Sequence, residues 1–187
     1  MNYYYRSIPS EEMSDFQRVY EKFVEMLPDE STIVELGVAD GRSVIMLASL
    51  MKEAGKRCKI WAVDNFSYGG DHQRNTVMKN IVNSGETTIE IMDMSSLDAS
   101  CRAQDNQFNM VFIDSWHTYE GTKAELRLWI HKVMNTGIVA GHDYLGIADV
   151  KKAVDELVPA EHLHIENTTY AHGVFWFIKS DEVKLLK

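Results

Sequence analysis

The stretch TIVELGVADGRS, residues 32–43, decides the fold of this chain. Its first five residues are mostly apolar and β-branched, which predicts a strand buried on both faces. Gly37 and Gly41 follow, and glycine lets a backbone turn tightly and approach a ligand closely. The N–H groups at the start of the helix predicted after Gly41 would bind a carboxylate. The alternative interpretation is a strand-to-helix turn that binds nothing, because two glycines alone specify no ligand.

Strand-like and helix-like segments alternate along the chain that follows. Further strand-like runs cover residues 59–63, 88–91, 110–113 and 137–140. Apolar residues recur at helical spacing within residues 44–51, 77–82, 126–133 and 150–157. This alternation predicts βαβ units, and therefore a parallel sheet with helices on both faces.

The last two strand-like runs, residues 162–165 and 174–178, break this rhythm. The loop between them is too short to hold a crossover helix, and parallel neighbours need a connection of about a dozen residues or more. We therefore expect these two strands to form an antiparallel hairpin. The predicted fold class is α/β, with a mostly parallel seven-stranded sheet that ends in a C-terminal antiparallel hairpin.

The length and composition predict one domain that covers residues 1–187. The chain is 45% hydrophobic and 25% charged, which is ordinary for a globular protein. Residues 1–28 are predicted as an N-terminal helical extension, because apolar residues recur at helical spacing from Ser10 to Leu27 and Pro28 follows. Ser10 is a residue type favoured at helix N-caps.

Charge and cysteine content exclude several classes of partner. The formal charge of −9 is spread along the chain, and such a surface repels phosphate backbones, so we expect no nucleic-acid partner. No run of roughly 18 apolar residues and no signal-peptide core is present, so we expect no membrane partner. Cys58 and Cys101 form neither a metal spacing nor a disulfide framework. Together these features predict a cytoplasmic protein.

Polar residues follow the second and third predicted strands. Asp64 and Asn65 end the second strand, where an acid can accept hydrogen bonds from both hydroxyls of a ribose. The alternative interpretation of Asp64 is a helix cap. Asp93 and Met94 end the third strand in the same way.

Two further motifs lie just past predicted strand ends, where open α/β sheets form their ligand sites. The first is FIDSWHTYEG, residues 112–121, in which His117 lies three residues after Asp114. The second is GIVAGHDY, residues 137–144, which contains His142 and Asp143.

With the glycine turn and the terminal hairpin, these motifs resemble the Rossmann-like class I S-adenosylmethionine-dependent methyltransferases. They are most similar to the small-molecule O-methyltransferase family that includes cephalosporin-pathway and macrolide-sugar enzymes. That family carries an Ile-Asp-x-x-His-x-Tyr-Glu stretch and a Gly-His-Asp-Tyr stretch at these places, and the resemblance runs from about Thr32 to Lys179. It implies an enzyme that methylates a hydroxyl of a small acceptor, such as a sugar or a secondary metabolite.

The resemblance also implies which residues bind S-adenosylmethionine. They lie in the glycine turn and after the second and third strands: Glu35, Gly37, Val38, Ala39, Gly41, Ser43, Asp64, Asn65, Asp93 and Met94. One departure is Ala39, which stands where the family often has a middle glycine. The N-terminal extension would either cover the acceptor pocket or form a homo-oligomer.

The resemblance further implies a divalent metal, Mg²⁺ or Mn²⁺, bound by Asp114, His142 and Asp143. His142 stands where better-known metal-dependent O-methyltransferases have an acid, and an imidazole shifts the preference away from Mg²⁺. The alternative is that His142 only donates hydrogen bonds and that no metal is required. His117 matches the family's general base, and its ordinary pKa of about 6.5 suits proton removal. Together with Asp114 it is predicted to be catalytic. The alternative is a structural His117.

The other histidines have no such companions and are expected on the surface or in the hairpin: His72, His131, His162, His164 and His172. Three other functions remain open. A regulatory S-adenosylmethionine-binding domain need not keep Asp114, His117 and Asp143 together. A nicotinamide-dependent oxidoreductase would need a G-x-G-x-x-G loop, which is absent here. A metal-dependent hydrolase would not explain the glycine turn.

Overall fold

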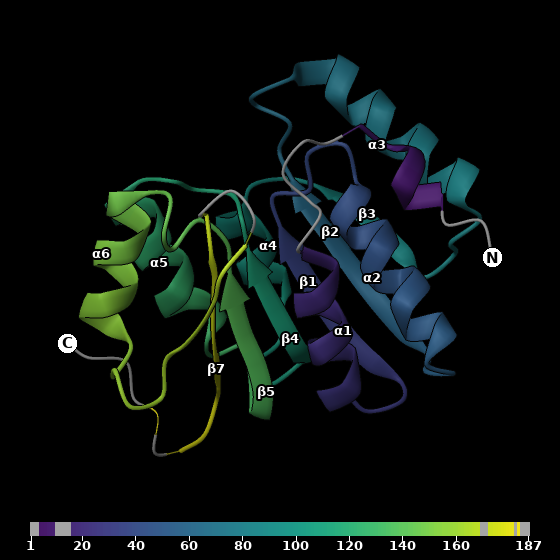
Figure 1. Ribbon diagram of the computed structural model, residues 1–187. Coiled ribbons are helices and arrows are strands. Elements are labelled where there is room, and N and C mark those ends of the chain that lie inside the picture. Colours follow the sequence, from purple (N-terminus) through teal and green to yellow (C-terminus); the bar gives the residue numbers. More distant parts are fainter. Residues whose placement is uncertain (1–3, 10–15, 169–171, 182, 184–187) are drawn as a thin grey trace.

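The computed structural model describes residues 4–9, 16–168, 172–181 and 183, and within them seven strands form one sheet (Figure 1). From edge to edge the strands are β3 (Ile89–Asp93), β2 (Cys58–Asp64), β1 (Ser31–Leu36), β4 (Phe108–Ile113), β5 (Val133–Gly141), β7 (Val174–Ile178) and β6 (His164–Glu166). The first five are parallel, and β7 is antiparallel to both β5 and β6. The predicted mostly parallel sheet with a terminal hairpin is confirmed.

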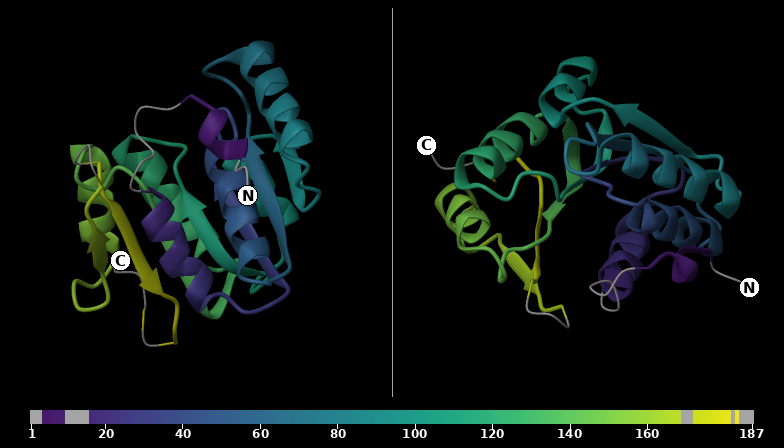
Figure 2. Two further views of the ribbon diagram at one scale, coloured as in Figure 1. Left: turned by 45° about the vertical axis from the view of Figure 1, so that its right-hand side comes forward. Right: turned by 90° about the horizontal axis from the view of Figure 1, so that it is seen from above.

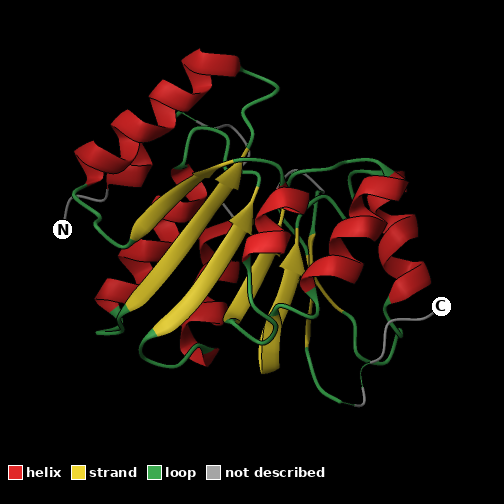
Figure 3. Cartoon of the chain, turned by 180° about the vertical axis from the view of Figure 1, so that it is seen from behind, coloured by secondary structure: helices red, strands yellow, loops and turns green. Residues whose placement is uncertain are grey.

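Helices cover both faces of the sheet and make a three-layer molecule (Figure 2). One layer contains α1 (Phe16–Met26), α2 (Arg42–Glu53) and α3 (Gly70–Ser84), near a short 3-10 helix, η1 (Tyr4–Ser7). The other contains α4 (Ser96–Arg102), α5 (Tyr119–Trp129) and α6 (Ala148–Leu157), which lie in front of the sheet in Figure 3.

The sheet has an apolar core on each side because side chains alternate along its strands. In β1, Ile33 packs into the core shared with α1 and α2, whereas Val34 and Leu36 pack into the core shared with α5 and α6. Strands of this kind, buried on both faces, produce the nearly unbroken apolar runs seen in the sequence.

The structure corrects several predicted boundaries. The predicted strand at 162–165 is found as β6 at His164–Glu166, and β5 begins at Val133 instead of residue 137. Val133 therefore belongs to a strand, paired with Phe108, and not to the preceding helix. The short elements η1 and α4 were not predicted, because four and seven residues are too few for a periodic apolar pattern. Ser10 and the start of the predicted N-terminal helix lie outside the described residues.

The parallel strands bring their carboxyl ends to one edge of the sheet. The motifs after β1, β2, β4 and β5 therefore lie near one another, although up to about a hundred residues separate them along the chain. Among the described helices, none is long and apolar enough to cross a membrane.

Candidate functional site

A cavity of about 690 Å³ opens at the carboxyl ends of β1, β2 and β4. Its walls come from three segments that the sequence singled out, which are residues 37–43, 63–65 and 114–117. Residues 94–96 complete one side, and Pro9, Ser67, Tyr68 and Gln73 lie at its margin. The glycine turn and the Asp114 motif thus share one cavity.

The glycine turn has a geometry that only its own sequence allows. Gly37 has a φ of +81°, and a Cβ there would lie 2.1 Å from the carbonyl oxygen of Asp114. Gly41 has a φ of +82°, and a Cβ there would lie 2.6 Å from Val77. Ala39 also has a positive φ, +44°, which is the backbone conformation that favours the glycine often found at this place in the family.

Asp64 holds this turn from the neighbouring strand. Its two carboxylate oxygens accept hydrogen bonds from the N–H groups of Val38, at 3.0 Å, and of Phe66, at 2.7 Å. Asp64 caps no helix, because α3 begins six residues later with Gly69 at its N-cap, so that alternative is wrong. The carboxylate lines the cavity beside Asn65.

The residues predicted to bind the cofactor divide into two groups. Those that line the cavity are Gly37, Val38, Ala39, Ser43, Asp64, Asn65 and Met94. Glu35, Gly41 and Asp93 do not line it. Asp93 forms an ion pair with Arg74 at 2.6 Å, so its carboxylate is engaged outside the cavity. Gly41 turns the backbone between the cavity wall and α2.

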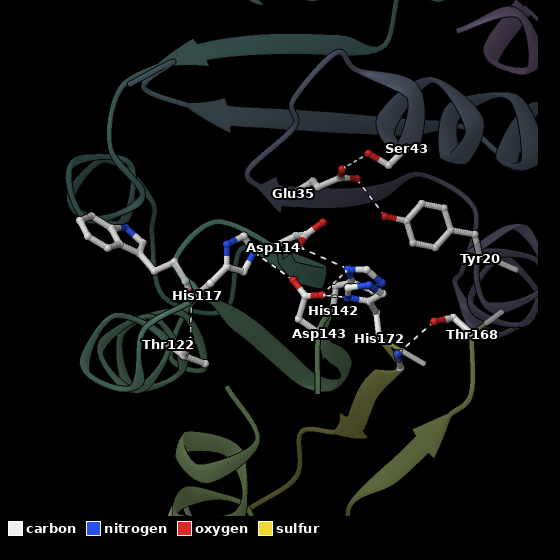
Figure 4. Close-up of polar contacts among 12 residues, drawn as sticks. Tyr20, Glu35, Ser43, Asp114, His117, Thr122, His142, Asp143, Thr168 and His172 are labelled. Atoms are coloured by element: carbon white, nitrogen blue, oxygen red, sulfur yellow. Dashed lines mark hydrogen bonds and ion pairs between the residues drawn. The ribbon is translucent and has the colours of Figure 1, made fainter. Parts of the chain in front are cut away.

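Glu35 lies behind the turn in the layer of α1 and α2, with 1% of its surface exposed. Its carboxyl group accepts hydrogen bonds from the hydroxyl of Tyr20, at 3.0 Å, and from that of Ser43 (Figure 4). Burial raises the pKa of Glu35 to about 8, against the lowering effect of the two hydroxyls. The interpretation of Glu35 as a direct cofactor ligand is therefore corrected to a buried support of the cavity wall.

Asp114, His117 and Asp143 converge past the ends of β4 and β5, and the first two line the cavity. One ligand atom from each of these three residues lies within 4.8 Å of the others. His117 Nε2 lies 3.0 Å from Asp143 Oδ2 and 3.5 Å from Asp114 Oδ1. Asp143 has a φ of +64°, an unfavourable conformation for a residue other than glycine and one that tends to occur at functional sites.

His142 lies across the two carboxylates from His117 (Figure 4). Its Nδ1 is 3.4 Å from Asp143 Oδ1 and 3.7 Å from Asp114 Oδ1, and the residue is buried. His117 lines the large cavity, whereas His142 does not. The two imidazoles therefore occupy different positions around one pair of acids.

His172 is a site residue that the sequence did not predict. It was expected on the surface or in the hairpin without companions, but its Nδ1 lies 2.7 Å from Asp143 Oδ1. Its ring stacks on that of His142, with centroids 5.7 Å apart and an interplanar angle of 21°. No local pattern indicates this contact, because His172 lies 29 positions after Asp143 in the chain.

The charges of the site differ from the expected ones. The imidazole of His117 donates hydrogen bonds to the carboxylates of Asp114 and Asp143, and these raise the pKa of His117 to about 10. The expectation of an ordinary pKa for His117 is therefore wrong for this arrangement. Burial acts to raise the pKa of Asp143, but the hydrogen bond from His117 and the charge of His142 hold it below its usual value. His117 is therefore protonated and Asp143 ionised at neutral pH.

Two aromatic side chains line the cavity, and a buried acid contacts its wall through Ser115. Trp116 and Tyr68 line it with 51% and 98% of their surface exposed. Ser115, also in the wall, donates a hydrogen bond to Glu125, which lies buried in α5. Burial raises the pKa of Glu125 to about 7. The sequence could have indicated Ser115 and Trp116, since they lie between Asp114 and His117.

Comparisons with known proteins agree with this fold. A family model described as a methyltransferase domain matches residues 34–144, from β1 to just beyond β5. Comparison with curated protein sequences gives no match.

Solved structures share the fold at low sequence identity. The O-methyltransferase NovP has a TM-score of 0.69 at 20% identity, covering 89% of this chain and 80% of its own. A Staphylococcus aureus protein described as a candidate caffeoyl-CoA O-methyltransferase has a TM-score of 0.72 at 15% identity, covering 94% and 87%. A candidate methyltransferase of Streptococcus mutans, solved with S-adenosylhomocysteine, has a TM-score of 0.64 at 11% identity, covering 96% and 100%.

Proposed function

The chain belongs to the methyltransferase domain family and is an S-adenosylmethionine-dependent enzyme, and from this premise we propose that it methylates a hydroxyl oxygen of a small acceptor. The acceptor class is a sugar or another hydroxylated metabolite. One observation carries the proposal: the glycine turn and Asp64 (the cofactor end) line the same cavity as Asp114 and His117 (the acceptor end). Methyl donor and acceptor must meet in one such space.

The cofactor end suits a nucleoside that carries an amino acid. Asp64 presents a carboxylate to the cavity, and the second lone pairs of its oxygens can accept from ribose hydroxyls. The backbone of the glycine turn approaches closely because Gly37 and Ala39 have positive φ values. Met94 supplies an apolar wall for a flat base.

A divalent metal fits the acceptor end by the chemistry of the donors there. His142 Nδ1 lies 3.7 Å from Asp114 Oδ1 and 3.4 Å from Asp143 Oδ1, so two carboxylates and one imidazole nitrogen offer donors to one ion. We assign Asp114, Asp143 and the buried His142 as the residues that would hold it, and this mixed donor set suits Mn²⁺ better than Mg²⁺. A bound divalent cation would make an acceptor hydroxyl more acidic.

His117 is then the group that takes the proton, because its ring reaches the cavity while His142 stays behind the carboxylates. With S-adenosylmethionine bound, the acceptor oxygen would take the methyl group as the carbon–sulfur bond breaks and S-adenosylhomocysteine forms, and Nε2 of His117 would take the hydroxyl proton. His117 must be neutral to accept it, and neutralising the charge of Asp114 and Asp143 would return its pKa towards the ordinary range. Most of the rate gain comes from positioning.

The test is methyl transfer from labelled S-adenosylmethionine to a panel of sugars, phenols and hydroxylated metabolites, in Mn²⁺, in Mg²⁺ and in chelator. On an accepted substrate, His117→Ala should lose about 10²–10⁴-fold in rate and still bind S-adenosylhomocysteine. The matched control is His131→Ala, an exposed histidine before β5 at the opposite edge of the sheet. Tight cofactor binding with no transfer to any acceptor would favour the regulatory domain instead.

A further inference from the structure

The loop between β6 and β7 carries His172 into contact with the carboxylate of Asp143. Nδ1 of His172 lies 2.7 Å from Oδ1 of that carboxylate, and the ring stacks on His142 (Figure 4). His172 is half-buried, with 30% of its side chain exposed, whereas 9% of the Asp143 side chain is exposed. The contact is therefore partly buried.

The backbone around His172 is tied to the loop that carries Asp143. The N–H groups of Leu145 and Gly146 donate to the carbonyl of His172, at 2.8 and 3.2 Å. The N–H of Tyr144 donates to the carbonyl of Gly173 at 3.2 Å. Three successive residues after Asp143 thus pair with the β6–β7 loop, which fixes the two loops relative to each other.

The residue at position 146 must be small because the His172 imidazole lies against it. A Cβ at Gly146 would lie 2.7 Å from Nδ1 of His172, so glycine at 146 lets the ring reach Asp143. On the other side, the N–H of Gly173 donates to the buried hydroxyl of Thr168 at 3.0 Å. Gly146 thus leaves room for the His172 ring, and Thr168 ties down the backbone of the next residue, Gly173.

Asp143 is consequently oriented from two directions. His117 contacts Oδ2 at 3.0 Å, and His172 contacts Oδ1 at 2.7 Å. The φ of +64° gives this residue a strained backbone, which the paired loops must maintain. A hydrogen bond from a neighbouring group fixes the direction in which a carboxylate presents its remaining lone pairs.

We propose that His172 is a positioning residue that orients Asp143 for binding a divalent cation. This inference rests on the metal site of the proposed function. His172 is not assigned as a ligand: its Nδ1–H donates to Asp143, and Asp143 keeps lone pairs for the ion. Outer hydrogen-bond partners of this kind typically change metal affinity by about 10–100-fold.

The test is titration of the folded protein with Mn²⁺, following the electron paramagnetic resonance signal of the free ion, without cofactor or acceptor. His172→Ala should raise the dissociation constant about 10–100-fold. His172→Asn, which keeps an N–H donor near the position of Nδ1, should recover most of the affinity. His131→Ala, the exposed histidine before β5, is the matched control and should bind Mn²⁺ like the parent.

Two readouts separate positioning from general support of the fold. Both His172 variants should keep the parental affinity for S-adenosylhomocysteine, because His172 does not line the large cavity. His172→Ala with parental Mn²⁺ affinity would overturn the inference. Equal losses in the alanine and asparagine variants would also overturn it, because the donated hydrogen bond would then not matter. A parent that binds no Mn²⁺ would overturn the proposed metal site itself and this inference with it.

Discussion

The regions around Glu35 and Asp143 show how two buried acids acquire opposite properties. Each lies at the carboxyl end of a strand, β1 or β5, with 1% and 6% of its surface exposed. Glu35 is surrounded by the hydroxyls of Tyr20 and Ser43, and burial raises its pKa to about 8. Asp143 is surrounded by imidazoles, which keep its pKa below the usual value.

The difference teaches that burial alone does not identify a functional carboxylate. Hydroxyls donate hydrogen bonds but carry no charge, so Glu35 remains largely neutral at neutral pH and supports the wall behind the glycine turn. Imidazoles supply both donors and charge, so Asp143 remains ionised. An ionised carboxylate is the form that a cation requires.

The largest expected effect comes from removing the ionised acid. Asp143→Ala should lower methyl transfer by about 100-fold or more, since a metal contributes several kcal/mol to the stabilisation of developing charge. The measurement is turnover on any acceptor that the parent methylates. Asp105→Ala is the matched control, because it removes an exposed acid that forms a surface ion pair with Lys132. Turnover of Asp143→Ala at the parental rate would show that the ionised carboxylate of Asp143 has no role in methyl transfer.

A second effect tests whether Glu35 is the neutral member of the pair. Its folded-state pKa of about 8 exceeds its ordinary value, so the folded protein holds a proton that the unfolded chain releases as pH rises. The free energy of unfolding should therefore fall between about pH 5 and 8, by up to about 1.4 kcal/mol per pH unit. Glu35→Gln cannot ionise and should flatten this fall.

Denaturant unfolding at pH 5.5 and 8.5 checks this prediction. Glu90→Gln, which changes an exposed glutamate in β3, is the control and should keep the parental pH dependence. The same loss in Glu35→Gln as in the parent would show that another group causes it.

A smaller effect on stability is expected at Tyr20, whose hydroxyl donates a hydrogen bond from α1 to Glu35. Tyr20→Phe should cost about 1 kcal/mol in the free energy of unfolding, the net value of one hydrogen bond. Because that hydrogen bond lowers the pKa of Glu35, its loss should also move the fall in stability to higher pH. Tyr68→Phe, at a ring 98% exposed, should leave both quantities unchanged. Unchanged unfolding in Tyr20→Phe would show that the hydroxyl contributes nothing.

The strands and the hairpin could be predicted because they depend on local patterns. Buried parallel strands give unbroken apolar runs, and the loop before β7 is too short for a crossover. The sequence also allows a prediction of the face of the sheet on which Glu35 lies. Alternation places it with Ile33 in the layer of α1 and α2, and away from Leu36.

The contacts of the acceptor end could not be predicted in the same way. His172 reaches Asp143 because three backbone hydrogen bonds join two loops from distant parts of the chain. The raised pKa of His117 depends on Asp143 as well as on Asp114, and the spacing from Asp114 to His117 reveals nothing about the second acid. Long-range packing sets both properties.

The most direct test of the account is calorimetric titration with S-adenosylhomocysteine, because the central claim assigns the cofactor to one end of the cavity and the chemistry to the other. Asp64→Ala should weaken binding by about 1.5–3 kcal/mol, the value of hydrogen bonds to a charged group, which is about 10–150-fold. Its melting temperature must be measured too, since Asp64 also holds Val38 and Phe66. Asp143→Ala should bind within about twofold of the parent, a difference of about 0.4 kcal/mol. A parent that does not bind, or an Asp143→Ala variant that loses as much affinity as Asp64→Ala, would contradict the account.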